Sequence, residues 1–209
     1  PDSCFASSDK PYEELIKLGH IKTVDYFKSF EDRLNKSVLQ HGKIWYHLKE
    51  TTKKASIITS LNPDKRFFFS KFNEPACINQ RLIGFIPLNA GVDIDICHAL
   101  LNSIIGIFFI EASGFGRGDG VLDLSKDKLE KSFMLNPDIL SDESKNNILK
   151  AFSVLKKRKI LPIEQELKMP DRIKFDNEVL KAYNICGLYG KIQNSLLEMV
   201  ATRLKAGNA

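Results

Sequence analysis

The sequence of 209 residues has few of the side chains that hold metal ions or disulfide frameworks. Its four cysteines, Cys4, Cys77, Cys97 and Cys186, form no C-x-x-C pair, and no group of cysteines and histidines has the spacing of zinc ligands. Cys97 stands next to His98, an arrangement that suits helix packing better than chelation. We therefore expect reduced, buried thiols in a cytoplasmic protein, and no bound metal.

Long apolar segments are also missing. The longest, Ile104 to Ile110, is too short to cross a bilayer, and the first residues lack the pattern of a signal peptide. No membrane partner is therefore expected. Because the chain opens on Pro1 rather than Met, we expect it to be part of a longer protein. Hydrophobic residues make up 43% and charged residues 27%, which is typical of a folded globular region.

The loops that would transfer a methyl group to adenine are absent as well. Such chemistry needs a glycine-rich turn after a strand, which binds S-adenosylmethionine, and an Asn/Asp-Pro-Pro-aromatic loop, which binds the adenine amino group. Asn62-Pro63-Asp64 and Asn136-Pro137-Asp138 begin like that loop but lack the second proline and the aromatic residue. Both are interpreted as turns. We expect no cofactor in this chain, and whether it is an enzyme stays open.

One weak catalytic pattern remains. Glu166-Leu167-Lys168, downstream of Pro137-Asp138, is similar to the carboxylate and lysine arrangement with which many restriction nucleases hold Mg²⁺. Here Glu166 falls in a predicted helix between Pro162 and Pro170 rather than on a strand. A magnesium-dependent nuclease is therefore kept only as an alternative.

The net charge of +5 is unevenly distributed. Residues 49–81 have 7 basic and 3 acidic side chains, and residues 145–209 have 13 basic and 6 acidic ones. Residues 82–144 have 4 basic and 10 acidic side chains. Folding could bring the two basic segments together as one surface that faces phosphates. The alternative is that these charges only solvate helix faces.

The hydrophobic pattern predicts an α+β fold. Helical spacing covers residues 11–40 and 93–111. Runs of β-branched and aromatic residues, including Ile44-Trp45-Tyr46 and Arg66 to Phe69, predict a small twisted mixed sheet from 44–86 and 121–135, with Asn73-Glu74-Pro75 as a turn. The helix at 93–111 would back this sheet. Further helices are predicted over 141–157, 162–168, 176–184 and 189–206.

Two domains follow from this pattern. Residues 1–140 would form an α/β core with N-terminal helices, and residues 141–209 a helical C-terminal subdomain. Between the predicted helix and the segment at 121 lies a loop, Ser113 to Gly120, with four glycines. It follows a helix, so it is not a dinucleotide fingerprint. We interpret it as a flexible loop that approaches a polyanion, with Arg117 at its tip, or else as a mobile loop without a ligand.

Basic, amide and aromatic side chains alternate over residues 65–81. Arg and Lys can bind guanine edges, and Asn and Gln can bind adenine edges. The phenylalanines here are more typical of a core than of base stacking. The residues expected to contact DNA are Lys53, Lys54, Lys65, Arg66, Lys71, Asn73, Asn79, Gln80, Arg81, Gly116, Arg117, Asp119, Lys126, Lys156, Lys157, Arg158 and Lys159.

The order of these segments resembles a known family. The most specific part is a helix with Leu100-Leu101-Asn102-Ser103, followed by the glycine-bearing loop, by Val121 to Leu129 and by Asn136-Pro137. A tail with Arg172-Ile173-Lys174-Phe175-Asp176 follows, and the segments together cover nearly the whole chain. They resemble the C-terminal target-recognition region of N6-adenine DNA methyltransferases of type II restriction–modification systems, including methyltransferase–nuclease fusions.

The resemblance implies a division of labour. In that family an N-terminal domain binds S-adenosylmethionine and transfers the methyl group, while the C-terminal region binds DNA. This chain would then bind double-stranded DNA and position the target adenine for an N-terminal methyltransferase domain of the same parent protein. Besides the nuclease, a non-catalytic protein-interaction module of a restriction system is kept as an alternative.

Overall fold

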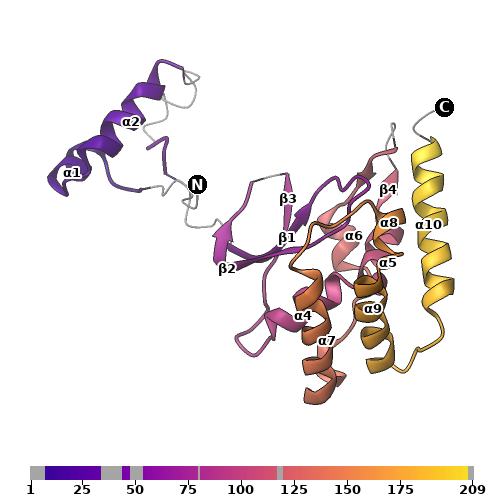
Figure 1. The fold of residues 1–209 in the computed structure, drawn as a ribbon. Helices are drawn as coiled ribbons and strands as arrows, with labels where there is room; N and C mark the ends of the chain where they lie inside the picture. Colours follow the sequence, from indigo (N-terminus) through magenta and orange to yellow (C-terminus); the bar gives the residue numbers. More distant parts are fainter. Residues whose placement is uncertain (1–7, 34–43, 48–53, 80, 117–119, 207–209) are drawn as a thin grey trace. The chain divides into compact units, whose positions relative to one another are not determined.

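The computed structural model describes residues 8–33, 44–47, 54–79, 81–116 and 120–206. The chain forms two compact units, residues 1–53 and residues 54–209 (Figure 1). The division thus falls at residue 53 rather than at 140. The predicted helical subdomain does not separate, because its helices contribute to two hydrophobic clusters, one shared with the helix that begins at Ile94 and one shared with the helix that begins at Ile104.

The first unit is a pair of short helices with an aromatic core. Helices α1 (Tyr12–Lys17) and α2 (Ile21–Glu31) are separated at Gly19, whose φ of +84° favours glycine. The run at Ile44 to Tyr46 is a turn and not the predicted strand. Its Tyr46 ring stacks on Phe27 with 4.3 Å between ring centroids, so the aromatic residues fill a helical core instead of a sheet.

A three-stranded antiparallel sheet opens the second unit. Strand β1 (Lys54–Ser60) lies between β2 (Ser70–Cys77) and β3 (Leu82–Phe85). It pairs antiparallel with both neighbours, so the sheet is antiparallel and not mixed as predicted. The segment 73–75, predicted as a turn, lies inside β2. Pro75 is tolerated there because β2 is an edge strand and its pairing with β1 has an irregular register. The run from Arg66 to Phe69, predicted as a strand, is irregular.

Only a short part of the segment from 121 to 135 is extended into a strand. Residues Leu122–Asp123 (β5) pair with Phe115–Gly116 (β4) in a separate two-stranded ribbon. The Ser125 side chain then accepts the Lys128 N–H and caps α6 (Lys126–Glu130). The three-stranded sheet therefore receives no strand from this segment within the described residues.

The predicted helix over 93–111 is two helices. Asp93 caps α4 (Ile94–Leu101), and Ser103 caps α5 (Ile104–Ser113), with a bend of 68° between them. The Ser103 hydroxyl donates to the Leu100 carbonyl at 2.7 Å and accepts the Gly106 N–H at 3.2 Å. One side chain thus ends the first helix and begins the second, because serine favours caps over helix interiors.

Four more helices complete the fold, and the α+β class with a helical C-terminal region is confirmed. They are α7 (Asp142–Leu155), α8 (Ile163–Glu166), α9 (Pro170–Ala182) and α10 (Tyr189–Ala206). Helix α4 packs on α7 and α9 in one cluster, whereas α5 packs on α10 and the sheet in another. No single helix of the described ranges is long and apolar enough to span a membrane; only the bent pair α4–α5, taken together, passes that test.

Candidate nucleic-acid interface

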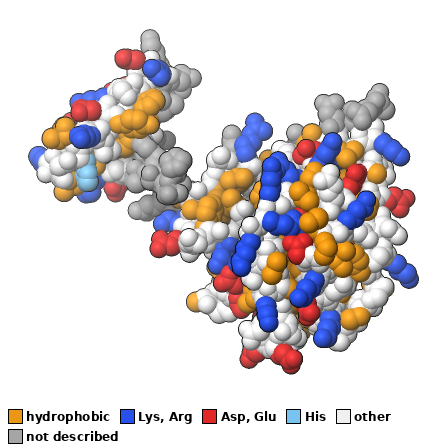
Figure 2. Space-filling model, viewed as in Figure 1, with side chains coloured by type: hydrophobic (Ala, Val, Ile, Leu, Met, Phe, Trp, Pro, Cys, Tyr) orange, Lys and Arg blue, Asp and Glu red, His pale blue; other side chains and the backbone are white. Residues whose placement is uncertain are grey.

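The fold brings the two basic segments of the sequence together. The backbone N–H of Ile163, at the start of α8, donates to the Lys65 carbonyl at 2.7 Å. A few residues away, the segment from Phe68 to Lys71 and the end of α7 line the same hollow. Segments about 90 positions apart in the sequence are therefore neighbours, which is the arrangement that their charge suggested. Figure 2 shows Lys and Arg side chains spread over the visible face of the second unit.

The hollow between the two segments has a volume of about 260 Å³ and is called here the basic pocket. Its lining combines three cations with aromatic rings and buried polar groups. It consists of Phe68, Phe69, Ser70, Lys71, His98, Asn102, Phe152, Leu155, Lys156, Arg158 and Ile160. Three residues expected to contact DNA, Lys71, Lys156 and Arg158, thus meet at one place.

The three cations differ in how firmly ion pairs hold them. The ammonium of Lys156 lies 5.5 Å from the centre of the Phe152 ring and forms no ion pair within the described ranges. Lys71 pairs with Asp95 at 2.8 Å, and its hydrogen bond holds the pKa of that carboxyl below its usual value. This pair is partly exposed, so solvent screens it and Lys71 can exchange partners.

Arg158 is bound more firmly. It donates to Glu166 at 2.8 and 2.9 Å and to Asp171 at 2.6 and 3.0 Å, and these hydrogen bonds raise its pKa. Its guanidinium is therefore committed to two carboxylates, and the geometry does not favour it as a phosphate contact. It borders the basic pocket as a fixed positive charge.

Glu166 belongs to a buried ion network rather than to a metal site. Burial alone would raise its pKa, but hydrogen bonds from Arg158 and from the Leu161 N–H, with the charge of Arg172, lower it. Arg172 is fully buried and donates to Glu166 at 3.1 Å. Because two guanidinium groups surround this carboxylate, Glu166 has no place for Mg²⁺ and does not suit the metal-ligand role that the nuclease alternative gives it.

Buried polar groups form the floor of the basic pocket. The Asn102 side chain accepts the Phe69 N–H and donates to the Phe69 carbonyl, both at 3.0 Å. His98 Nε2 lies 2.8 Å from the same carbonyl. These bonds satisfy the backbone N–H and carbonyl of Phe69, which lies in an irregular segment outside the described strands. They also fix Phe68 and Lys71 beside α4. No sequence pattern could have indicated His98, because its partner is a backbone atom.

The other expected contacts lie elsewhere. Lys65, Arg66, Lys157 and Lys159 are exposed on the two segments that meet, whereas Lys54, Asn73, Asn79 and Arg81 are exposed on the sheet or its turns. Lys126 is exposed on α6, 3.5 Å from Glu130. None of these lines the basic pocket. Lys53, Gln80, Arg117 and Asp119 lie outside the described residues.

Helix α10 holds the C-terminal end of the glycine-rich segment and the part of α5 that precedes the segment. Arg203 pairs with the buried Glu111 at 2.7 Å and also donates to the Gly120 carbonyl. Gly120 has a φ of +70°, and a β-carbon there would lie 3.1 Å from Leu204. Gly116 is exposed in β4, where its partner is Leu122. Gly120 is therefore fixed against α10, and Gly116 is fixed by its pairing with β5.

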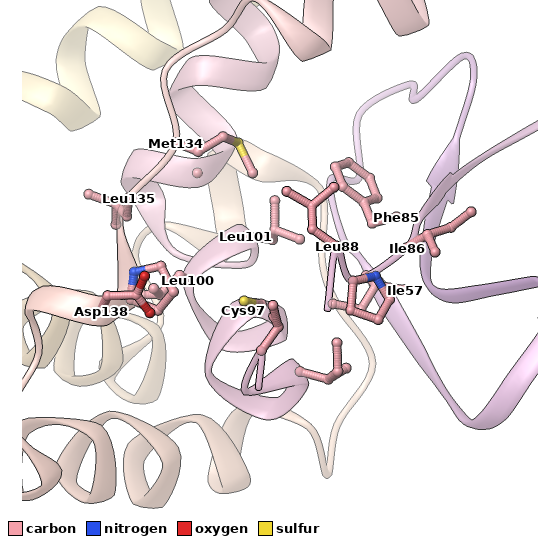
Figure 3. Close-up of a pocket in the computed structure, with 15 residues that line it drawn as sticks. Ile57, Phe85, Ile86, Leu88, Cys97, Leu100, Leu101, Met134, Leu135 and Asp138 are labelled. Carbon is pink, nitrogen blue, oxygen red and sulfur yellow. The ribbon is translucent and has the colours of Figure 1, made fainter. Parts of the chain in front are cut away.

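A second hollow, of about 320 Å³, is almost entirely apolar. In Figure 3, Leu88 and Phe85 face Cys97 and Leu101 across it, and Met134 closes one side. Leu88 is 97% exposed, and burial raises the pKa of the Cys97 thiol. With so few polar groups, this pocket offers no chemistry for nucleic acid, and the groups of acidic, histidine and cysteine side chains in the described ranges include no metal site.

Comparison with models of protein families, with curated proteins and with solved structures finds no match for this chain.

Proposed function

We propose that this chain binds double-stranded DNA and serves as the target-recognition region of an N6-adenine DNA methyltransferase. The observation that carries the proposal is the meeting of the two basic segments around the basic pocket, with Lys71 and Lys156 at its rim. Such a surface suits a polyanion, because each neutralised phosphate releases condensed counterions. The amide and basic side chains of β2 and its neighbouring turns supply groups that can bind base edges.

In this proposal, the chain itself transfers no methyl group. A separate domain of the parent protein would hold S-adenosylmethionine, and the region described here would set which adenine reaches it. The resemblance of the Leu-Leu-Asn-Ser helix and the Arg-x-x-x-Asp segment to that family supports this assignment. Both segments are parts of the scaffold that shapes the basic pocket, as the contacts of Asn102 and Arg172 indicate.

The test is DNA binding by the purified chain. Fluorescence anisotropy with a pool of random 30-base-pair duplexes should give an affinity that falls steeply with salt, with a log–log slope of about −3 to −6 if several phosphates are contacted. Repeated selection from the pool should then enrich one short sequence that contains an adenine. Binding without any salt dependence, or no binding at 50 mM salt, would refute the proposal. A protein-interaction module predicts that second outcome.

A further inference from the structure

His98, which lines the basic pocket, has a buried ring nitrogen with no hydrogen-bond partner among the described residues. His98 is only 6% exposed, and its Nδ1 is unpaired. Because a carbonyl oxygen can only accept, the contact with Phe69 places the proton on Nε2 and leaves Nδ1 as an acceptor. Burial, with the charges of Lys156 and Lys71, lowers the pKa of His98 and keeps the ring neutral. An unpaired buried acceptor is unfavourable until a donor reaches it.

Flat apolar surfaces stand beside this acceptor. The Phe152 ring meets the His98 ring edge to face, with 5.0 Å between centroids. Phe68, on the same pocket wall, is 46% exposed although its neighbours Phe67 and Phe69 are buried. The Phe68 carbonyl accepts the Thr59 hydroxyl at 3.0 Å, so the backbone that presents this ring is fixed. An exposed aromatic ring on a fixed backbone is a suitable stacking surface.

The pocket has the size and charge for a ring with phosphates beside it. Its volume of about 260 Å³ is several times the share of one water molecule, about 30 Å³. The ammonium groups of Lys71 and Lys156 border it, and both act electrostatically on His98. An anion with no N–H or O–H group would use these cations but would leave the neutral Nδ1 acceptor without a donor. A nucleotide uses all three kinds of group.

We propose that the basic pocket takes one unstacked nucleobase with an exocyclic amino group, from DNA bound at the surrounding cations. The amino group donates to His98 Nδ1, Phe68 stacks on the base, and Lys71 and Lys156 bind the flanking phosphates. This inference rests on the proposed DNA-binding function. It adds a base-binding site within the chain itself, separate from the catalytic domain of the parent.

The experiment measures binding to duplexes that differ at one bulged nucleotide, since a bulged base costs little to unstack. Four otherwise identical duplexes are compared by anisotropy. One is fully paired, and the other three carry a bulged abasic site, a bulged unsubstituted purine (adenine without its amino group, called here purine) or a bulged adenine. Stacking should make the purine bulge bind about tenfold tighter than the abasic bulge. The amino group, present in adenine and absent in purine, should add a further several-fold gain.

Two variants assign these gains to residues. Phe68→Ala changes an exposed side chain and should reduce the preference for purine over the abasic site, while Phe133→Ala, an exposed ring that does not line this pocket, should leave it unchanged. His98→Phe keeps a ring against Phe152, and the Asn102 side chain still binds the Phe69 N–H and carbonyl, so the preference for adenine over unsubstituted purine should be lost while the gain from stacking on Phe68 remains. Its folding is checked by thermal unfolding.

The possible failures are distinguishable. If the fully paired duplex binds with the expected salt dependence but all bulges bind alike, the base site is refuted and the DNA-binding function stands. Gains that persist in Phe68→Ala also refute it. If no duplex binds, both proposals fail. An equal affinity for adenine and purine bulges would mean that water, and not a base, satisfies Nδ1, which overturns the assignment of the amino group.

Discussion

The guanidinium of Arg172 donates to the backbone carbonyl of Asn102 at 2.5 Å, across 70 positions of sequence. Asn102 ends α4, and Arg172 lies in the first turn of α9, so the bond joins the two segments whose sequence is most distinctive. Arg172 also pairs with Glu166 at 3.1 Å and lies 3.6 Å from Asp176. The Asp176 carboxyl group in turn accepts a hydrogen bond at 2.8 Å from the backbone N–H of Ile104, the first residue of α5. Side chains of α9 thus stabilise the bend between α4 and α5 by hydrogen bonds to the backbone on both sides of it.

Removing the charge of Arg172 should therefore be costly. In Arg172→Met the apolar stem remains, but Glu166 and Asp176 lose a buried positive partner. We expect a loss of about 3–5 kcal/mol in the free energy of unfolding, as for other buried ion pairs broken on one side. Lys174→Ala, an exposed position on the same helix, should change it by less than about 0.5 kcal/mol. Urea unfolding followed by circular dichroism gives both values, and similar losses in the two variants would contradict the network's importance.

Asp176 should make stability depend on pH in an unusual direction. Burial raises its pKa to about 7, because the loss of solvation outweighs the opposing effects of the Arg172 charge and of the hydrogen bond from the Ile104 N–H. In the unfolded chain this carboxyl ionises near its ordinary value of 3.8. Between these values the folded state holds one more proton, so raising the pH from about 4 to 7 lowers stability through this group.

Asp176→Asn isolates this contribution. The amide oxygen can still accept the Ile104 N–H, but the group no longer titrates. Glu166 and Asp171, whose pKa values are lowered, remain in both proteins and act at more acidic pH. The difference in unfolding free energy between Asp176→Asn and the wild type should therefore grow in favour of the variant from pH 5 to pH 7. A constant difference across that range would show that Asp176 stays ionised.

Periodicity predicted where most helices lie, but it placed the start of α9 at residue 176 instead of Pro170 and merged α4 with α5. Asp93, Ser125 and Ser141 each cap a helix where a polar residue precedes an apolar repeat. The break at Asn102-Ser103 is visible in the sequence, since both residues favour helix ends. The continuous apolar pattern around them conceals it, because α4 and α5 are both buried.

The sheet and the pocket were harder to predict. The run from Arg66 to Phe69 has strand composition, but its backbone is satisfied by the Asn102 and Thr59 side chains rather than by a neighbouring strand. Asn73-Glu74-Pro75 has turn composition, but an edge strand accepts it. Which cations stay free depends on distant acids, so Arg158 and Lys156, two positions apart, have different roles. Only the three-dimensional contacts of Glu166 and Asp171 separate them.

Two glycines offer a matched test of helix packing. A β-carbon at Gly106 would lie 2.5 Å from the carbonyl oxygens of Leu100 and Leu101, where α5 turns back on α4. Gly106→Ala should therefore lower the free energy of unfolding by about 1–3 kcal/mol through overpacking. Gly190, in the first turn of α10, has nothing within 4 Å of such a carbon. Gly190→Ala should raise it by about 0.5–1 kcal/mol, and equal effects in the two variants would mean that the close approach at the bend is not restrictive.

The cations at the basic pocket should contribute to DNA binding additively and without sequence preference. Lys156→Ala removes an ammonium that has no ion pair in the described ranges, so folding should be nearly unaffected. Its affinity for a paired duplex should fall, equally for cognate and scrambled sequences, and the slope of log affinity against log salt should become shallower by about one.

Lys191→Ala removes the same charge from an exposed position of α10 that does not line the pocket, and should leave the slope unchanged. The slopes are measured by anisotropy between 50 and 200 mM salt. If both variants reduce the slope alike, net charge and not the basic pocket attracts the DNA. If neither does, the phosphates lie against another face.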